Sequence, residues 1–189
     1  DMGWTSNSTT DYDSDGCQDG SDEDLDDDND SVLDSDDQCS KGELGWISTH
    51  DEGLGGGGYS DRDADGCKDS SEDEDDDNDS FLDENDDCVH MFGNSTINAM
   101  GCIDSDGDGW TEEDSDYWSE DDLPSNPTQW QDYDGDGYGD NSGGFQPDSC
   151  TSEPGTSFND QFGCPDSDSD GWSDYTDELP FDDTEWLDF

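Results

Sequence analysis

Basic side chains are almost absent from this chain of 189 residues, which has 3 Lys and Arg and 2 His against 60 Asp and Glu. The formal net charge at pH 7 is −57. Nucleic acids and anionic membrane surfaces bind basic footprints, so this charge excludes both as partners. No run approaches the roughly 18 consecutive apolar residues that a spanning helix needs, and we expect no membrane insertion in this segment.

Large apolar side chains are also scarce, because Leu, Ile, Val and Phe together number 20 of 189 residues. Such a chain has too little apolar surface for a conventional hydrophobic core. Neither the helical nor the strand period is sustained, since short acidic segments alternate with Gly, Ser, Asn and Pro. We therefore expect an irregular fold, mostly loop, with little helix or strand. Like charges repel over a Debye length of roughly 8–10 Å, so compaction requires bound cations.

The 7 Cys lie among carboxylates with almost no His, which argues against zinc clusters and favours disulfides in an oxidising compartment. An extracellular or cell-surface location follows as an expectation. His50 and His90 are isolated in the sequence, and we expect both to be solvated. No nucleophile stands with a base and an orienting group, so we do not expect an enzyme.

Two kinds of internal repeat organise the chain. In the first half, Asp15-Gly16-Cys17 recurs 50 residues later as Asp65-Gly66-Cys67. In the second half, Cys88, Cys102, Asp104 and Trp110 recur with an offset of 62 as Cys150, Cys164, Asp166 and Trp172. Because repeats of this size decide the architecture, we expect an elongated tandem array. The predicted repeats are 1–44 and 45–87 of the first type, and 88–149 and 150–189 of the second, with the outer two cut by the chain ends.

The recurring element is Asp-x-Asp-x-Asp-Gly, followed by acids at the ninth and twelfth positions. Hard oxygen ligands at this spacing suit calcium, which takes six to eight oxygens at roughly 2.3–2.6 Å. The sixth position makes a sharp turn, and the seventh contributes its backbone carbonyl. Seven loops fit this template, beginning at Asp11, Asp26, Asp61, Asp75, Asp104, Asp132 and Asp166.

Five of the loops carry a full set of predicted ligands, although Ser31 and Ser80 replace the glycine in two of them. The predicted ligands are Asp11, Asp13, Asp15, Cys17, Asp19 and Asp22; Asp26, Asp28, Asp30, Val32, Asp34 and Asp37; Asp61, Asp63, Asp65, Cys67, Asp69 and Glu72; Asp75, Asp77, Asp79, Phe81, Asp83 and Asp86; and Asp166, Asp168, Asp170, Trp172, Asp174 and Asp177.

Two loops lack an acid at the twelfth position. The first contains Asp104, Asp106, Asp108, Trp110 and Glu112, and is closed either by Asp116, which is near, or by Asp121, which the repeats align. The second contains Asp132, Asp134, Asp136, Tyr138 and Asp140, and its last ligand stays open. At least about seven calcium ions are expected. More ions are expected than loops, and the candidates to bridge a second ion between paired loops are Asp24, Asp73 and Glu74.

Cysteine spacing suggests a disulfide scheme. Cys88 to Cys102 and Cys150 to Cys164 each span 14 positions with glycines at matching places, so we pair them in this way. The homologous step in the first half pairs Cys39 with Cys67 and leaves Cys17 for a partner upstream of residue 1. The rival scheme joins Cys17 to Cys39 and Cys67 to Cys88.

The segments 26–39 and 75–88, in which a Cys follows the closing acid by two residues, resemble thrombospondin type 3 repeats. That resemblance implies an elongated, calcium-wrapped, disulfide-linked chain of the kind found in extracellular animal proteins and in bacterial and archaeal surface proteins. The implied function is a rigid stalk, spacer or filament subunit that contacts further repeats or identical chains. The alternative is a calcium-dependent adhesin that binds a glycan or another partner. Asn7 and Asn94 are candidate glycosylation sites in linkers.

Overall fold

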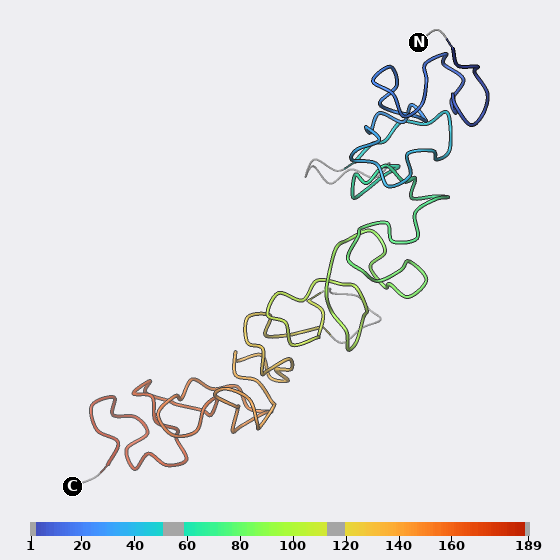
Figure 1. Cartoon of the computed structure of the whole chain (residues 1–189). Helices are drawn as coiled ribbons and strands as arrows, with labels where there is room; N and C mark the ends of the chain where they lie inside the picture. The colour runs from blue at the N-terminus through green and yellow to red at the C-terminus, as the bar shows by residue number, and fades with distance from the viewer. Residues whose placement is uncertain (1–2, 51–58, 113–119, 188–189) are drawn as a thin grey trace. The chain divides into compact units, whose positions relative to one another are not determined.

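A computed structural model of the chain describes residues 3–50, 59–112 and 120–187 (Figure 1). No residue in these three ranges belongs to a helix or a strand, and the backbone runs through turns, bends and extended segments. The expectation of a mostly-loop fold is confirmed at this level. The local reason is that Gly, Asn, Ser and Asp recur every few residues and favour turns over regular hydrogen-bond ladders.

The chain divides into two compact units, Asp1–Phe92 and Gly93–Phe189. The first unit contains the four loops that begin at Asp11, Asp26, Asp61 and Asp75. The second contains the three loops that begin at Asp104, Asp132 and Asp166. The division into four repeats and the elongated form stay predictions from the sequence.

Three disulfides involve six of the seven cysteines. Cys39 is bonded to Cys67 and Cys150 to Cys164, with Cα atoms 5.1 and 5.0 Å apart. Cys88 and Cys102 are also disulfide-bonded, and Cys17 is free. The first two pairs match those expected from the repeats. The rival scheme is wrong, because it assigned both Cys39 and Cys67 to other partners.

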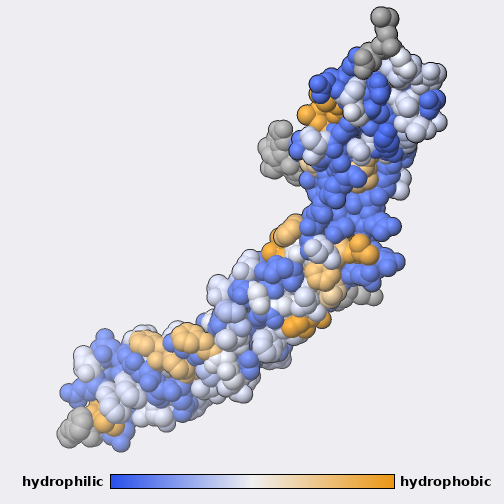
Figure 2. Space-filling model, viewed as in Figure 1, coloured by the Kyte–Doolittle hydropathy of each residue, from blue (hydrophilic) through white to orange (hydrophobic). Residues whose placement is uncertain are grey.

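Buried side chains in the described residues are mainly polar. The buried apolar residues are Cys67, Ala99, Cys102 and Cys164, whereas the buried polar set includes thirteen aspartates. Figure 2 shows the same balance at the surface, where hydrophilic residues cover most of the visible face and apolar residues form small separate patches. Carboxylates buried in this way are costly unless a partner compensates their charge.

Two cysteine-closed segments in the second unit share one backbone arrangement. The N–H groups of Asn94 and Ser95 donate to the Cys102 carbonyl at 2.9 and 3.0 Å. The N–H groups of Thr156 and Ser157 donate to the Cys164 carbonyl at 3.1 and 3.2 Å. Both segments therefore fold back over a cysteine carbonyl, and each contains a glycine immediately before the residues that donate.

Substitution of Gly155 by alanine is expected to destabilise the second unit, because a Cβ there would overlap the carbonyl carbon of Cys164. Overpacking against a backbone that cannot yield costs about 1–3 kcal/mol of unfolding free energy. The matched control is Gly143→Ala, whose Cβ would meet only Asn141 Oδ1 at 3.6 Å. Thermal unfolding of both variants in saturating calcium would measure the difference, and equal midpoints would contradict the expectation.

Candidate metal-binding loops

All seven predicted loops have the same backbone signature. Their fourth residues have φ between 58° and 80°, and these are Ser14, Asn29, Ala64, Asn78, Gly107, Gly135 and Ser169. Their sixth residues have φ between 83° and 98°, and these are Gly16, Ser31, Gly66, Ser80, Gly109, Gly137 and Gly171. Left-handed backbone is unfavourable for residues other than glycine. Ser31 and Ser80 nevertheless adopt it, so the loop conformation is retained where the glycine is missing.

A common set of hydrogen bonds holds each loop, as the one that begins at Asp166 illustrates. The first carboxylate accepts from the sixth N–H, here Gly171 to Asp166 at 3.0 Å. The fifth carboxylate accepts from the seventh N–H, here Trp172 to Asp170 at 2.8 Å. The ninth carboxylate accepts from the second N–H, here Ser167 to Asp174 at 2.8 Å.

The same three bonds recur in each of the other six loops. A fourth also recurs in all seven, in which the ninth N–H donates to the carbonyl that precedes the loop. The acids therefore have one oxygen fixed by the backbone of their own loop. This local bonding explains why a short sequence motif can shape each loop without a helix or strand.

Several of the second carboxylate oxygens are buried without a hydrogen-bond partner. Asp30 accepts from Val32 through Oδ1, while its Oδ2 is buried and has no hydrogen bond. Asp108 shows the same division between an Oδ1 bonded to Trp110 and an unpartnered Oδ2. Buried anionic oxygens without donors require a cation nearby. These unpartnered oxygens therefore support metal binding independently of the spacing of the acids.

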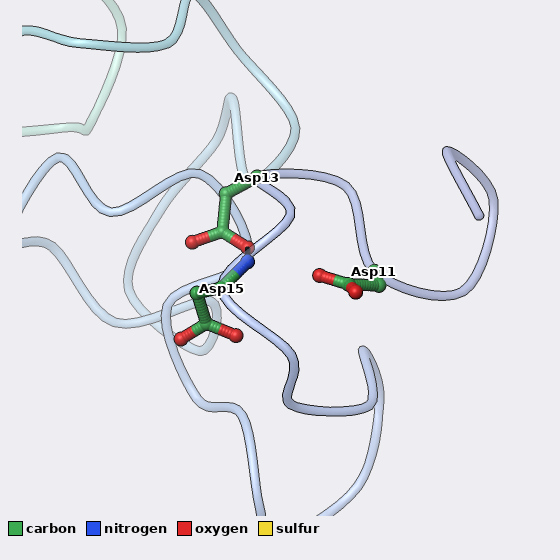
Figure 3. Close-up of side chains that lie close together, drawn as sticks. All are labelled: Asp11, Asp13 and Asp15. Atoms are coloured by element: carbon green, nitrogen blue, oxygen red, sulfur yellow. Dashed lines mark hydrogen bonds between the residues drawn. The ribbon is translucent and has the colours of Figure 1, made fainter. Parts of the chain in front are cut away.

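The loop carboxylates gather in clusters. In at least three of the loops, one ligand atom from each of the first, third and fifth aspartates lies within 4.8 Å of the others, namely in Asp11, Asp13 and Asp15, in Asp26, Asp28 and Asp30, and in Asp61, Asp63 and Asp65. Figure 3 shows the first cluster, in which the side chains of Asp11, Asp13 and Asp15 lie close together. Carboxylate-only clusters are typical of hard divalent cations.

Burial and mutual repulsion raise the pKa of several clustered carboxyl groups. Burial, with the nearby charges of Asp28 and Asp26, raises the pKa of Asp30 from 3.8 to about 6. Burial and the charge of Asp65 raise the pKa of Asp63 to about 7. A bound divalent cation would reverse this effect, because it favours the ionised form of every carboxylate around it.

The twelfth-position aspartates share a further bond. Asp37 Oδ1 accepts from the Cys39 N–H at 2.6 Å, and Asp177 Oδ1 from the Leu179 N–H at 2.6 Å. Asp86 makes the same bond to Cys88 at 2.7 Å. In each case the closing acid accepts from the N–H two residues further along the chain.

Asp121 has this closing bond in the Asp104 loop, since its Oδ1 accepts from the Leu123 N–H at 2.8 Å. It is only 6% exposed. Burial, with the charges of Asp108 and Asp106, raises its pKa to about 6. Asp121 therefore lies where a closing ligand is needed, while the alternative, Asp116, lies outside the described residues.

Asp148 is the closing residue that the sequence analysis missed in the Asp132 loop. Its Oδ1 accepts from the Cys150 N–H at 2.7 Å, and its Oδ2 is buried without a partner. Asp148 is 7% exposed, and burial with the charges of Asp136 and Asp134 raises its pKa to about 6. The signal was present in the sequence, because the closing acid precedes a cysteine by two residues here as it does at Cys39.

Residues 141–147, which separate Asp140 from Asp148, fold over Gln129, and Gln129 has no exposed surface. Gln129 Oε1 accepts from the Asn141 N–H at 2.9 Å, and its Nε2 donates to the Asn141 carbonyl at 3.1 Å. The Asp148 N–H then donates to the Gly139 carbonyl at 2.8 Å. A buried side-chain amide thus returns the chain to the loop and brings Asp148 beside it.

Two further clusters lie between paired loops. One ligand atom from each member lies within 4.8 Å of the others, both in Asp19, Asp24 and Asp27 and in Asp69, Asp73 and Asp76. Asp24 and Asp73 are two of the residues expected to bridge a second ion, whereas Asp27 and Asp76 were missed. Glu74, the third candidate, is exposed.

The predicted ligands at the ends of the first and third loops differ from the other closing acids. Asp22 is exposed, while the nearby Asp24 is buried with Oδ2 unpartnered. Glu72 is half-buried, its Oε2 has no hydrogen bond, and its carboxylate lies against Gly42. The roles of these two acids as ligands stay predictions.

Asparagines at the fourth position join the paired loops. Asn29 Nδ2 donates to Asp13 Oδ2, and Asn78 Nδ2 donates to Asp63 Oδ2. Both asparagines therefore contact the carboxylate at the third position of the preceding loop. The candidate glycosylation residues Asn7 and Asn94 are exposed, although Asn7 Nδ2 donates to the Thr5 carbonyl at 2.9 Å. Their modification stays a prediction.

Comparisons with protein-family models and with curated proteins found no match to this chain. Among the described residues there is also no helix with the length and apolar character needed to cross a membrane. The resemblance to thrombospondin type 3 repeats therefore stays an interpretation of the loop motifs.

Proposed function

We propose that this chain is a calcium-stabilised extracellular structural repeat protein that acts as a rigid stalk, spacer or filament subunit. One observation carries the proposal: seven loops share one backbone form that fixes their carboxylates by internal hydrogen bonds, and several of the buried carboxylate oxygens in them have no donor. The resemblance to thrombospondin type 3 repeats supports the same reading. Calcium is the expected ion because the ligands are oxygens held on flexible loops, which accommodate six to eight contacts.

Ion binding in one loop is coupled to the next loop by contacts and by covalent bonds. The Gln38 N–H donates to the Asp65 carbonyl at 2.7 Å, and Gln38 Nε2 donates to Asp65 Oδ2 at 2.8 Å. The Cys39–Cys67 disulfide joins the same two places. The end of the Asp26 loop is thereby fixed to the Asp61 loop. Order produced by one ion therefore extends to its neighbour, which is the property that a stiff spacer requires.

Removal of calcium is expected to expand the chain, because carboxylates brought together in the loops repel each other without an ion. Small-angle scattering and limited proteolysis in calcium and in chelator would test this. In chelator we expect a radius of gyration approaching roughly 46 Å, the value for an unfolded chain of this length. Order and protease resistance should return near millimolar calcium, the range of extracellular modules. A radius that does not change on chelation would contradict the proposal.

The adhesin alternative draws support from exposed aromatic residues in the second unit, such as Tyr133 and Phe181. The tryptophans have less free ring surface for a glycan, because Trp110 stacks on Trp130 with ring centroids 5.9 Å apart, and Trp172 stacks on Trp186 at 4.1 Å. Glycan-array binding that disappears with chelator would favour the adhesin.

Assembly of identical chains into a filament is a separate part of the proposal. The free thiol of Cys17 is half-buried. Non-reducing gels and direct imaging should show high polymers if chains assemble. A clean monomer would exclude the filament proposal but not the spacer proposal.

A further inference from the structure

The two inter-loop clusters are equivalent in the first-half repeats. Asp24 and Asp27 correspond to Asp73 and Asp76 with an offset of 49, and Asp19 corresponds to Asp69 with an offset of 50. The backbone contacts also agree, since Asp27 donates its N–H to Asp34 at 2.9 Å and Asp76 to Asp83 at 3.0 Å. Each copy therefore holds its three carboxylates in the same local frame.

A basic side chain at equivalent positions reaches each cluster. Lys41 Nζ lies 3.1 Å from Asp27 Oδ2 in the first copy and also pairs with Asp19 Oδ2. His90, exactly 49 residues after Lys41, places Nδ1 3.1 Å from Asp76 Oδ2 in the second copy. His90 was expected to be isolated and solvated; its side chain is 54% exposed, but the contact with Asp76 shows that it is not isolated.

The second cluster contains buried oxygens without donors, as the first does at Asp24 Oδ2 and Asp27 Oδ1. Asp76 is 3% exposed and its Oδ1 has no hydrogen bond, and Asp73 Oδ2 is likewise buried without a partner. Arg62 Nε approaches Asp69 Oδ2 no closer than 3.7 Å. The first copy shows that a positive group belongs at this place, because the ammonium of Lys41 pairs with two of its three carboxylates.

The change from lysine to histidine alters what the cluster can bind. A protonated ammonium supplies charge but no lone pair, whereas an imidazole nitrogen is a good ligand for zinc and related divalent metals. We propose that Asp69, Asp73, Asp76 and His90 form a site for a zinc-class divalent metal in addition to the calcium ions of the loops, with Asp69 shared between the Asp61 loop and this site. Three carboxylate oxygens and one imidazole nitrogen supply the four ligands that zinc commonly takes.

An open cavity of about 330 Å³ beside the cluster gives a metal ion access, and its lining residues are Tyr59, Arg62, Asp69, Ser70, Asp76 and His90. The site rests on the proposed function, because the loops that begin at Asp61 and Asp75 must be ordered by calcium to bring its carboxylates together. At the first copy, the same chemistry predicts no zinc, since Lys41 already provides the cation.

Zinc titration of the calcium-saturated full chain by calorimetry tests the proposal. We expect one zinc equivalent per chain beyond the loop ions. Cobalt should bind at the same site and should perturb the ring signals of His90, but not those of His50, in nuclear magnetic resonance spectra. His90→Lys, which copies the first repeat, should weaken zinc binding at least about 100-fold, because it removes a direct ligand where outer contacts alone are worth about 10–100-fold. His50→Gln is the matched control and should bind as the original chain does.

The reverse substitution, Lys41→His, should create a second zinc equivalent at the Asp19, Asp24 and Asp27 cluster. Small-angle scattering of each variant in calcium distinguishes failure of the zinc site from failure of the proposed function. An ordered chain that takes up no zinc, or whose zinc affinity is unchanged by His90→Lys, overturns this site alone. A chain that is not ordered by calcium overturns both the site and the proposed function.

Discussion

Acidification from about pH 7 to about pH 4 is expected to compact the metal-free chain and to remove the extra stability that calcium provides. In the metal-free chain, burial and neighbouring charges raise the folded-state pKa of Asp37, Asp63 and Asp76 from 3.8 to about 7. The folded form then binds more protons than the unfolded form across this window. Its stability is highest below about pH 4 and falls as the pH rises through 7.

Calcium inverts the sign of this dependence. Carboxylates must be ionised to hold the ion, so protons compete with calcium as the pH falls and the stability that calcium confers is lost. Scattering of thoroughly desalted protein and of protein in millimolar calcium, each at both pH values, would measure the two trends. The radii with and without calcium should differ most at pH 7 and converge at pH 4, and a difference that grows on acidification would show that the buried carboxylates are not the calcium ligands.

Replacement of Asp148 by asparagine is expected to remove one calcium ion from the second unit. Asparagine has nearly the same shape and retains an oxygen to accept from the Cys150 N–H, but it lacks the negative charge and offers a weaker ligand to the Asp132 loop. We expect affinity at this loop to fall by at least about 10-fold. Residues 132–150 should lose hydrogen-exchange protection at calcium concentrations that order the original chain.

The matched control is Asp183→Asn, which removes the same charge from an exposed side chain outside the predicted loops. Native mass spectrometry at millimolar calcium should count one ion fewer in the Asp148 variant than in this control. Exchange protection in the first unit should be equal in the two variants. An equal number of bound ions and equal protection of residues 132–150 would exclude Asp148 as a ligand.

Local interactions made the loops predictable. The first, fifth and ninth acids bond to backbone groups only a few residues away, so the motif itself contains both the ligands and the groups that orient them. The same reasoning holds for Ser31 and Ser80, which occupy the sixth position with φ of 85° and 83°. The disulfides Cys39–Cys67 and Cys150–Cys164 followed from the repeats because equivalent segments fold in equivalent ways.

Contacts between loops were harder to predict from the sequence. Asp148 reaches the Asp132 loop only after residues 141–147 have folded over Gln129, so its distance from the start of the loop departs from the template, and only its spacing from Cys150 matches the other closing acids. Asp76 and His90 are 14 residues apart and come together only in the folded chain, so neither stood out in the sequence.

By itself, the sequence determined the seven loops, their register and the mostly-loop class, since these depend on the spacing of acids and turn residues along a few positions. Only the tertiary structure decided which acid closes the Asp132 loop and which carboxylates form the inter-loop clusters. The physical reason is that buried charge is placed by the packing of separate loops around it, and this packing has no fixed sequence separation.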